Sequence, residues 1–279
     1  MVIRDTRTGG YAMSWRFLRV GQSGSATVSA IEALIAGLGS VDREDPELSA
    51  YNYLRWVERA ERELRSRFVD PSVWRVLHTE RYWRIRSITS STIRPLTMIQ
   101  SESADQRLVL EAIADQLRHY EKMLTPGPDE RLLLLDTNVL VHGLLFGQVA
   151  WNELTAERKV RLIMPLIVID ELDNLKNRSE SKAASALREL DRHLVPGHGL
   201  SNTALRTNVT LQIVDEPVGH HRLANADDEI VHQAGYFASL SENRITLITS
   251  DRGMRVRAEA ASIEVLMLPT RLRRSTKEG

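Results

Sequence analysis

The chain has 279 residues, of which 42% are hydrophobic and 27% are charged, a balance that is typical of globular proteins and excludes a fully disordered chain. No apolar run reaches the roughly 18 residues that a membrane-spanning helix needs. The charges of the 37 basic and 37 acidic residues cancel, so the net charge gives no sign of a nucleic-acid partner. There is no cysteine, which excludes disulfides, thiolate metal sites and cysteine nucleophiles.

The first half of the chain has the pattern of a helical domain. A helix is expected over residues 26–38, and residues 46–68 carry apolar side chains at helical spacing. Asp70-Pro71 is typical of an N-cap followed by proline at the first helical position. One further helix is therefore expected to follow it, carrying Val73, Trp74, Leu77, Tyr82 and Trp83. Another helix is predicted over residues 102–124.

Arginine and aromatic residues are concentrated in this half. Residues 51–95 contain ten arginines and five acidic residues, and Tyr51, Tyr53 and Trp56 lie among the arginines. Exposed aromatic rings can stack on bases while arginine contacts phosphates. Interspersed glutamates are also typical of a solvated amphipathic helix whose aromatic residues lie in the core. Both interpretations stay open.

A break in the helical pattern separates the two halves. Pro126-Gly127-Pro128 cannot continue a helix, because proline lacks a backbone N–H. We therefore predict two domains, a helical domain of unknown role over residues 1–128 and a second domain over residues 131–270.

The second domain alternates strands with helices. Short aliphatic runs predict strands at residues 132–135, 161–164, 209–214, 245–249 and 263–268. Helical patterns lie between and after them, at residues 139–146, 166–176, 181–194, 227–240 and 252–260. Strands separated by helices require right-handed crossovers, so the fold class is α/β with a five-stranded parallel sheet.

Four acidic residues lie at equivalent places in this pattern. Asp136 ends the first strand, Glu171 follows the second, Asp227 opens a helix and Asp251 follows the fourth strand. Ligands of open parallel sheets bind beyond the carboxyl ends of the strands, so these carboxylates should converge there. A divalent cation would cancel their repulsion, and oxygen ligands suit Mg²⁺ or Mn²⁺. Such a site suits metal-assisted hydrolysis of phosphodiesters.

Each acid also has a structural interpretation. Asp136 and Asp251, taken singly, are typical of helix caps, and Asp227 can stabilise the start of a helix through the helix dipole. Glu171 is harder to explain structurally, because aliphatic residues flank it. The four acids in this order favour the metal site over four independent caps.

The acids lie within four stretches, Leu135-Asp-Thr-Asn-Val-Leu140, Pro165-Leu-Ile-Val-Ile-Asp-Glu-Leu-Asp173, Asp227-Asp-Glu-Ile-Val231 and Thr249-Ser-Asp-Arg252. In this combination, residues 131–270 resemble the PIN domain, a family of metal-dependent nucleases. The resemblance implies a three-layer fold with strand order 3-2-1-4-5 and a Mg²⁺ or Mn²⁺ site. It also implies cleavage of single-stranded RNA or, in flap-endonuclease relatives, of structured DNA.

The resemblance also implies residue roles. Asp136, Glu171, Asp227 and Asp251 match the family's acidic positions, as catalytic residues and metal ligands. Asp227 is preferred over Asp228 because the family's Asp stands three residues before an Ile, here Ile230. The positions that would support the carboxylates are Asn138, Asp228, Thr249 and Ser250. Ser250 is a departure, since many members have Asn there.

Basic residues near the acids are candidate substrate contacts. Lys176, Arg252 and Arg255 can contact phosphates, while a solvated helix face is the alternative for each. The pair His220-His221 is expected to lie in a loop, since the implied chemistry needs no histidine ligand.

The sequence therefore predicts a bacterial, cytoplasmic, metal-dependent endoribonuclease that hydrolyses single-stranded RNA; the absence of cysteine agrees with a reducing cytoplasm. One alternative is a PIN-fold RNA-binding or regulatory module with little catalysis, and another is a DNA-directed, flap-type nuclease. No membrane partner is expected. The sequence leaves open a homo-oligomer, an antitoxin or another protein partner.

Overall fold

A computed structural model describes residues 17–19, 21–89, 91–178, 180–194, 202–217, 220–241 and 244–273. The described residues divide into two compact units, unit 1 within Met1–Lys122 plus Pro217–Gly219 and unit 2 within Met123–Glu216 plus His220–Gly279. The domain boundary at residues 128–131 stays a prediction. None of the described helices is long and apolar enough to cross a membrane.

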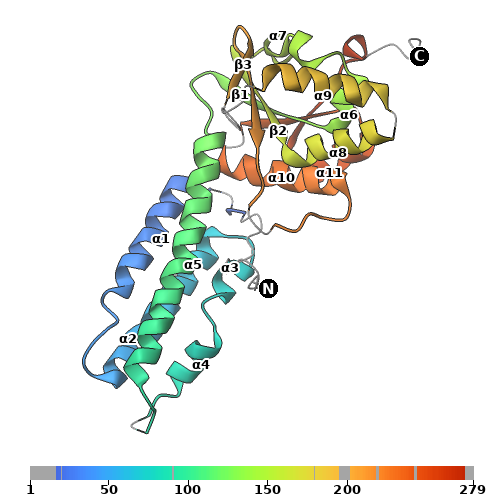
Figure 1. Ribbon diagram of the computed structural model, residues 1–279. Helices are drawn as coiled ribbons and strands as arrows, with labels where there is room; N and C mark the ends of the chain where they lie inside the picture. The colour runs from blue at the N-terminus through green and yellow to red at the C-terminus, as the bar shows by residue number, and fades with distance from the viewer. Residues whose placement is uncertain are drawn as a thin grey trace. The chain divides into compact units, whose positions relative to one another are not determined.

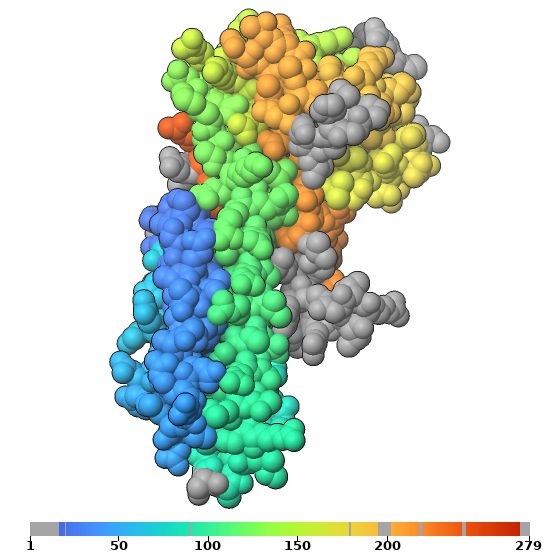
Figure 2. Space-filling model, turned by 60° about the vertical axis from the view of Figure 1, so that its left-hand side comes forward, coloured from blue at the N-terminus to red at the C-terminus, as the bar shows by residue number. Residues whose placement is uncertain are grey.

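Unit 1 is helical, as Figure 1 shows. Its helices are α1 (Gly24–Leu38), α2 (Pro46–Arg67), α3 (Ser72–Arg75), α4 (Glu80–Arg86) and α5 (Pro95–Leu124). Side chains cap the first two, since Ser23 accepts from the Ala26 N–H and Asp45 accepts from the first turn of α2. Helix α1 lies beside α5 in both Figure 1 and Figure 2, and Arg118 of α5 pairs with Glu32 of α1.

The single helix predicted after Asp70-Pro71 is wrong. The structure has two short helices, α3 and α4, because the Thr79 hydroxyl accepts the Tyr82 N–H and starts a new helix there. Helix α5 also begins at Pro95 rather than at residue 102. Proline at the first helical position explains that start.

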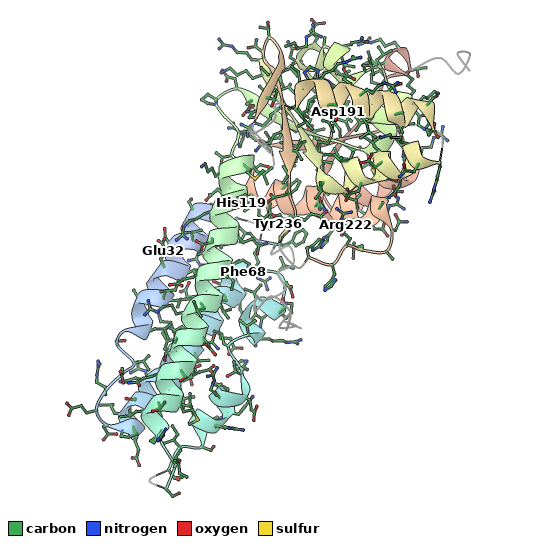
Figure 3. The ribbon with its side chains drawn as sticks, in the orientation of Figure 1. Glu32, Phe68, His119, Asp191, Arg222 and Tyr236 are labelled. Atoms are coloured by element: carbon green, nitrogen blue, oxygen red, sulfur yellow. The ribbon has the colours of Figure 1, made fainter. Side chains whose placement is uncertain are left out.

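The core of unit 1 is apolar but contains one buried carboxylate. Phe68, labelled in Figure 3, is buried with Ile31, Leu64 and Leu110. Glu102 of α5 is also buried; it accepts hydrogen bonds from Tyr53 of α2 at 3.2 Å and from Thr79 at 2.6 Å, and it pairs with Arg81 of α4 at 2.9 Å. These bonds satisfy the buried charge and join three helices.

Unit 2 contains a six-stranded sheet in the order β3-β4-β2-β1-β5-β6. The strands are β1 (Glu130–Leu135), β2 (Lys159–Pro165), β3 (Thr203–Arg206), β4 (Val209–Val214), β5 (Ile245–Thr249) and β6 (Glu264–Met267). All pairings are parallel except that of β3 with β4. The five parallel strands follow the predicted order 3-2-1-4-5 when counted along the chain, so that part of the prediction is confirmed.

The prediction of five strands missed the edge strand β3. Its burial alternates between half-buried and exposed positions, so it lacks the continuous aliphatic run of the central strands. A two-residue turn at Thr207 and Asn208 joins β3 to β4, with Asn208 in the left-handed region at φ 63°. Asparagine tolerates that conformation, which closes the hairpin.

Helices cover the sheet (Figure 1). They are α6 (Thr137–His142), α7 (Trp151–Thr155), α8 (Leu166–Asn177), α9 (Ser181–His193), α10 (Ala226–Leu240) and α11 (Arg252–Ala260), with 3₁₀ turns at Phe146–Gln148 and Thr270–Leu272. The helix predicted over residues 139–146 instead ends at His142. At the next residue, Gly143, a Cβ atom would lie 2.3 Å from the Val139 carbonyl oxygen, so only glycine fits this end.

Candidate active site

The four predicted acids lie at the carboxyl ends of the strands or in the helices that follow. Asp136 directly follows β1, Asp251 comes two residues after β5, and Glu171 lies in α8, which directly follows β2. Asp227 lies in the first turn of α10. The topology thus assembles them at one edge of the sheet from positions far apart in the chain.

Asp136 is the buried centre of this group, at 1% exposed. Its Oδ2 accepts a hydrogen bond of 2.7 Å from the Thr249 hydroxyl, whereas its Oδ1 is buried with no hydrogen-bond partner among the residues that the structure describes. Burial raises the pKa of Asp136 to about 6, opposed by the Thr249 hydroxyl and the Asn138 backbone N–H and reinforced by the charges of Asp227 and Glu171. Glu171 and Asp227 therefore lie close enough to Asp136 for their charges to act on it.

Glu171 is oriented by a residue that the sequence analysis did not single out. The Thr137 hydroxyl, in the first turn of α6, donates to Glu171 Oε2 at 2.6 Å. Thr137 is itself buried, so it fixes one carboxylate oxygen of α8 relative to the end of β1. Its place directly after Asp136 was the one available signal.

Asp227 and Asp228 share a cation from α11. Arg257 Nη2 lies 2.7 Å from Asp227 Oδ2, and Arg257 Nε lies 3.2 Å from Asp228 Oδ1. The side chains are only partly buried, so solvent screens the attraction. The guanidinium nevertheless neutralises part of the acidic group.

Asp251 acts as the N-cap of α11. Its Oδ1 accepts from the Met254 N–H at 2.7 Å, and its own N–H donates to the Thr249 hydroxyl oxygen at 3.0 Å. Thr249 thereby links Asp251 to Asp136 at the buried end of β5. The neighbouring Ser250 hydroxyl is buried without a hydrogen-bond partner, and the Asn138 side chain forms no hydrogen bond with any described residue.

The three basic residues predicted to contact the substrate lie in different surroundings. Arg255 pairs with Glu259 at 2.7 Å on the same exposed helix face, and Lys176 lies 3.9 Å from Asp173 on α8. Arg252 is exposed. None of these three contacts a site carboxylate within the described residues.

Ion pairs hold the loop before α10 in place, and His220 lies in this loop, as predicted. Arg222, labelled in Figure 3, pairs with Glu216 at 2.8 Å and with Asp170 of α8 at 2.7 Å. His220 Nε2 lies 2.9 Å from Oε1 of the buried Glu229 of α10. Burial raises the pKa of Glu229, but hydrogen bonds from His220, the Leu223 backbone N–H and Gln233 outweigh it and lower the pKa to about 2. The histidine therefore has a carboxylate partner in the fold, and the loop holds the start of α10 against α8.

The donor chemistry fits a hard divalent cation. The candidate ligands are all carboxylate oxygens, and the buried Asp136 Oδ1 forms no hydrogen bond within the described part of the chain. Within the ranges described, however, no three acidic or histidine side chains stand close enough to hold one ion together. The carboxylates are instead bound separately, Glu171 by Thr137, Asp227 by Arg257 and Asp251 by its own helix.

Comparison with known proteins gives a family match for this part of the chain. The family model of the PIN domain matches residues 133–268. Among solved structures, the chain is similar to "a domain of a functionally unknown protein" from Methanocaldococcus jannaschii, with 19% identity and a TM-score of 0.35 over 53% of this chain and 96% of that one. No curated protein matches.

Proposed function

Residues 133–268 belong to the PIN domain family, whose members are generally nucleases, and from this premise we propose that the chain is a metal-dependent endoribonuclease acting on single-stranded RNA. The observation that supports the proposal is at Asp136. This buried carboxylate interacts with the charges of Glu171 and Asp227, and its Oδ1 has no hydrogen-bond partner among the described residues. A buried carboxylate among others is costly unless a cation offsets its charge.

The residues that would hold Mg²⁺ or Mn²⁺ are Asp136, Glu171, Asp227 and Asp251. A bound divalent ion would supply charge stabilisation at phosphorus and a more acidic water. Thr249 and Thr137 hold the first two carboxylates in place by hydrogen bonds, which prepares the site for a cation. The expected location is the cytoplasm, with which the cysteine-free composition agrees.

One observation favours a second candidate, an RNA-binding or regulatory PIN module with little catalysis. Arg257 already pairs with Asp227 and Asp228, and the described acids form no ready cluster of three. A protein cation on a ligand carboxylate reduces the need for a metal ion. Cleavage assays separate the two candidates.

The test incubates the purified full chain with labelled single-stranded RNA, single-stranded DNA and a DNA flap, each with Mn²⁺, Mg²⁺ or EDTA. RNA should be cut with metal and not with EDTA, and Asp136→Asn should lower the rate by about 100-fold or more. Asp173→Asn is the matched control, an exposed carboxylate on α8 near the site, and should cut like the unaltered protein.

Other results would change the proposal in defined ways. RNA that is bound but uncut with every metal would favour the regulatory module. Cleavage of the DNA flap alone would assign a flap-type nuclease. The proposal would be contradicted if the protein neither bound nor cleaved any of these nucleic acids.

A further inference from the structure

Helix α4 of unit 1 and His78, which lies two residues before it, form a cluster of three rings. The Tyr82 and His78 ring centroids are 4.9 Å apart at 64°, and those of Tyr82 and Trp83 are 4.9 Å apart at 76°, which are edge-to-face arrangements. Trp83 is nevertheless 54% exposed. The other tryptophans among the described residues are buried, so an indole left in water is unusual in this chain.

An arginine without a carboxylate partner lies against this ring. The Arg86 guanidinium carbon is 5.7 Å from the Trp83 ring centroid, and Arg86 forms no ion pair with any described residue. Arg84 of the same helix differs, because it pairs with Glu80. A cation and an aromatic face are thus presented to solvent together.

Helix α2 repeats this arrangement. The Arg55 guanidinium carbon lies 5.7 Å from the ring of Tyr51, which is 56% exposed. Arg59 and Arg62 follow on the same helix face, since residues four, eight and eleven positions after Tyr51 fall within one narrow stripe. Both arginines are exposed. The acidic residues next to them in the chain are Glu58, Glu61 and Glu63, and of these Glu61 pairs with Arg65 and Glu63 with Arg67.

The charge of this region is not cancelled locally. Four of the ten arginines over residues 51–95 pair with carboxylates. The other six form no ion pair within the described part of the chain and are exposed: Arg55, Arg59, Arg62, Arg75, Arg86 and Arg94. A partner for this surface should therefore be an anion.

We propose that the surface of unit 1 around Trp83 and Arg86 binds single-stranded nucleic acid. Unpaired bases can stack on the exposed indole, while arginines contact the phosphates. A duplex keeps its bases stacked internally and cannot offer them to the ring, and an acidic peptide would satisfy the arginines without using the ring. The binding goes beyond the proposed cleavage, because it needs neither a metal nor the acids of unit 2.

The test measures binding of the full chain to a labelled single-stranded RNA by fluorescence anisotropy, in EDTA so that no metal-dependent cleavage occurs. Trp83→Ala should weaken binding by about 5- to 100-fold, the range expected for one stacked base. Trp83→Leu, which keeps apolar bulk, should weaken it similarly. Arg86→Ala should reduce the slope of log affinity against log salt by about 0.7.

Matched variants act as controls. Leu108→Ala removes an apolar side chain of similar exposure, 57%, and Arg84→Ala removes an ion-paired arginine of the same helix. Both should bind like the unaltered protein, and a duplex of the same sequence should bind more weakly and without dependence on Trp83. Binding that depends on Trp83 in EDTA, where the cleavage site holds no metal, separates this surface from that site.

Three results would overturn the proposal. The first is that Trp83→Ala binds RNA as tightly as Leu108→Ala does. The second is that the duplex binds as tightly as the single strand, and the third is that the protein binds no RNA. In the last case, binding of an acidic protein that depends on Trp83 would assign the surface to a protein partner instead.

Discussion

Asp136 is a carboxyl group that folding places where ionisation is unfavourable. Burial raises its pKa from 3.8 to about 6, so the folded chain binds a proton more readily than the unfolded chain between these values. The free energy of unfolding should therefore fall as pH rises from about 4 to about 6, by about 3 kcal/mol at most. Above that window the whole cost of the buried charge is present.

Asp136→Asn should remove this cost in the metal-free protein. An asparagine oxygen can still accept the bond from Thr249, so the fold is retained. We expect the variant to melt several degrees higher than the unaltered protein at pH 8 in EDTA and at the same temperature near pH 4. Thermal melts across this pH range check the prediction, with Asp173→Asn as the exposed control. Equal melting temperatures of Asp136→Asn and the unaltered protein at pH 8 would contradict the assigned burial cost.

Arg257 supplies a positive charge to the acidic residues Asp227 and Asp228. Arg257→Ala should lower the metal-free stability by about 1 kcal/mol, because Asp227 and Asp228 lose their partner. Mn²⁺ should then raise the melting temperature more in the variant than in the unaltered protein, since the ion no longer competes with the guanidinium. Arg255→Ala, which breaks an exposed pair with Glu259, is the control. The same metal response in both variants would refute the competition.

At the scale of elements, helix starts are part of the site. Asp251 caps α11, and Asp136 is the residue before the first turn of α6. The geometry of the acids therefore depends on where the helices begin. A substitution at such a position changes both a helix end and a charge.

Two substitutions at Asp251 separate these effects. Asp251→Asn keeps an oxygen that can accept the Met254 N–H, so stability should stay near that of the unaltered protein. Asp251→Ala loses the cap and should cost about 1 kcal/mol of unfolding free energy. Both should lose cleavage if the charge is needed. Equal melting temperatures in denaturation experiments would show that the cap contributes little.

At the scale of the molecule, unit 2 includes residues before its first strand. Arg161 of β2 is 11% exposed and donates to the Met123 carbonyl oxygen at 2.7 Å, and it pairs with Glu130. Its Nη1 also contacts Gln212 of β4 at 3.2 Å. A fragment that starts at residue 131 would leave this cation with Gln212 but without its carboxylate.

We therefore expect a fragment of residues 123–279 to be more stable than one of residues 131–279. Loss of the carboxylate partner of a buried cation costs about 3–5 kcal/mol. Melting of the two fragments by circular dichroism measures the difference. Arg161→Met in the shorter fragment should recover part of the loss, because it removes the unpaired charge. Equal stability of the two fragments would show that residues 123–130, Glu130 included, are dispensable.

Local patterns were sufficient to predict most of unit 2. The aliphatic runs of β4 and β5 and the pattern of α11 predicted those elements at their observed bounds, because buried parallel strands and amphipathic helices leave periodic signals in sequence. The order of the parallel strands followed from the family resemblance. The edge strand β3 and the break between α3 and α4 were missed, since a short exposed strand and a threonine cap leave weak signals.

Sequence patterns alone were enough to show which acids stand at the ends of strands and helices. The tertiary structure decided what each acid contacts: Thr249 reaches Asp136 across 113 residues, Thr137 reaches Glu171 across 34, and Arg257 reaches Asp227 across 30. Periodicity reports only which face of an element is buried, whereas such contacts depend on how separate elements pack. For the same reason the sequence could not distinguish Tyr53 and Trp56, which are core residues, from the exposed Tyr51.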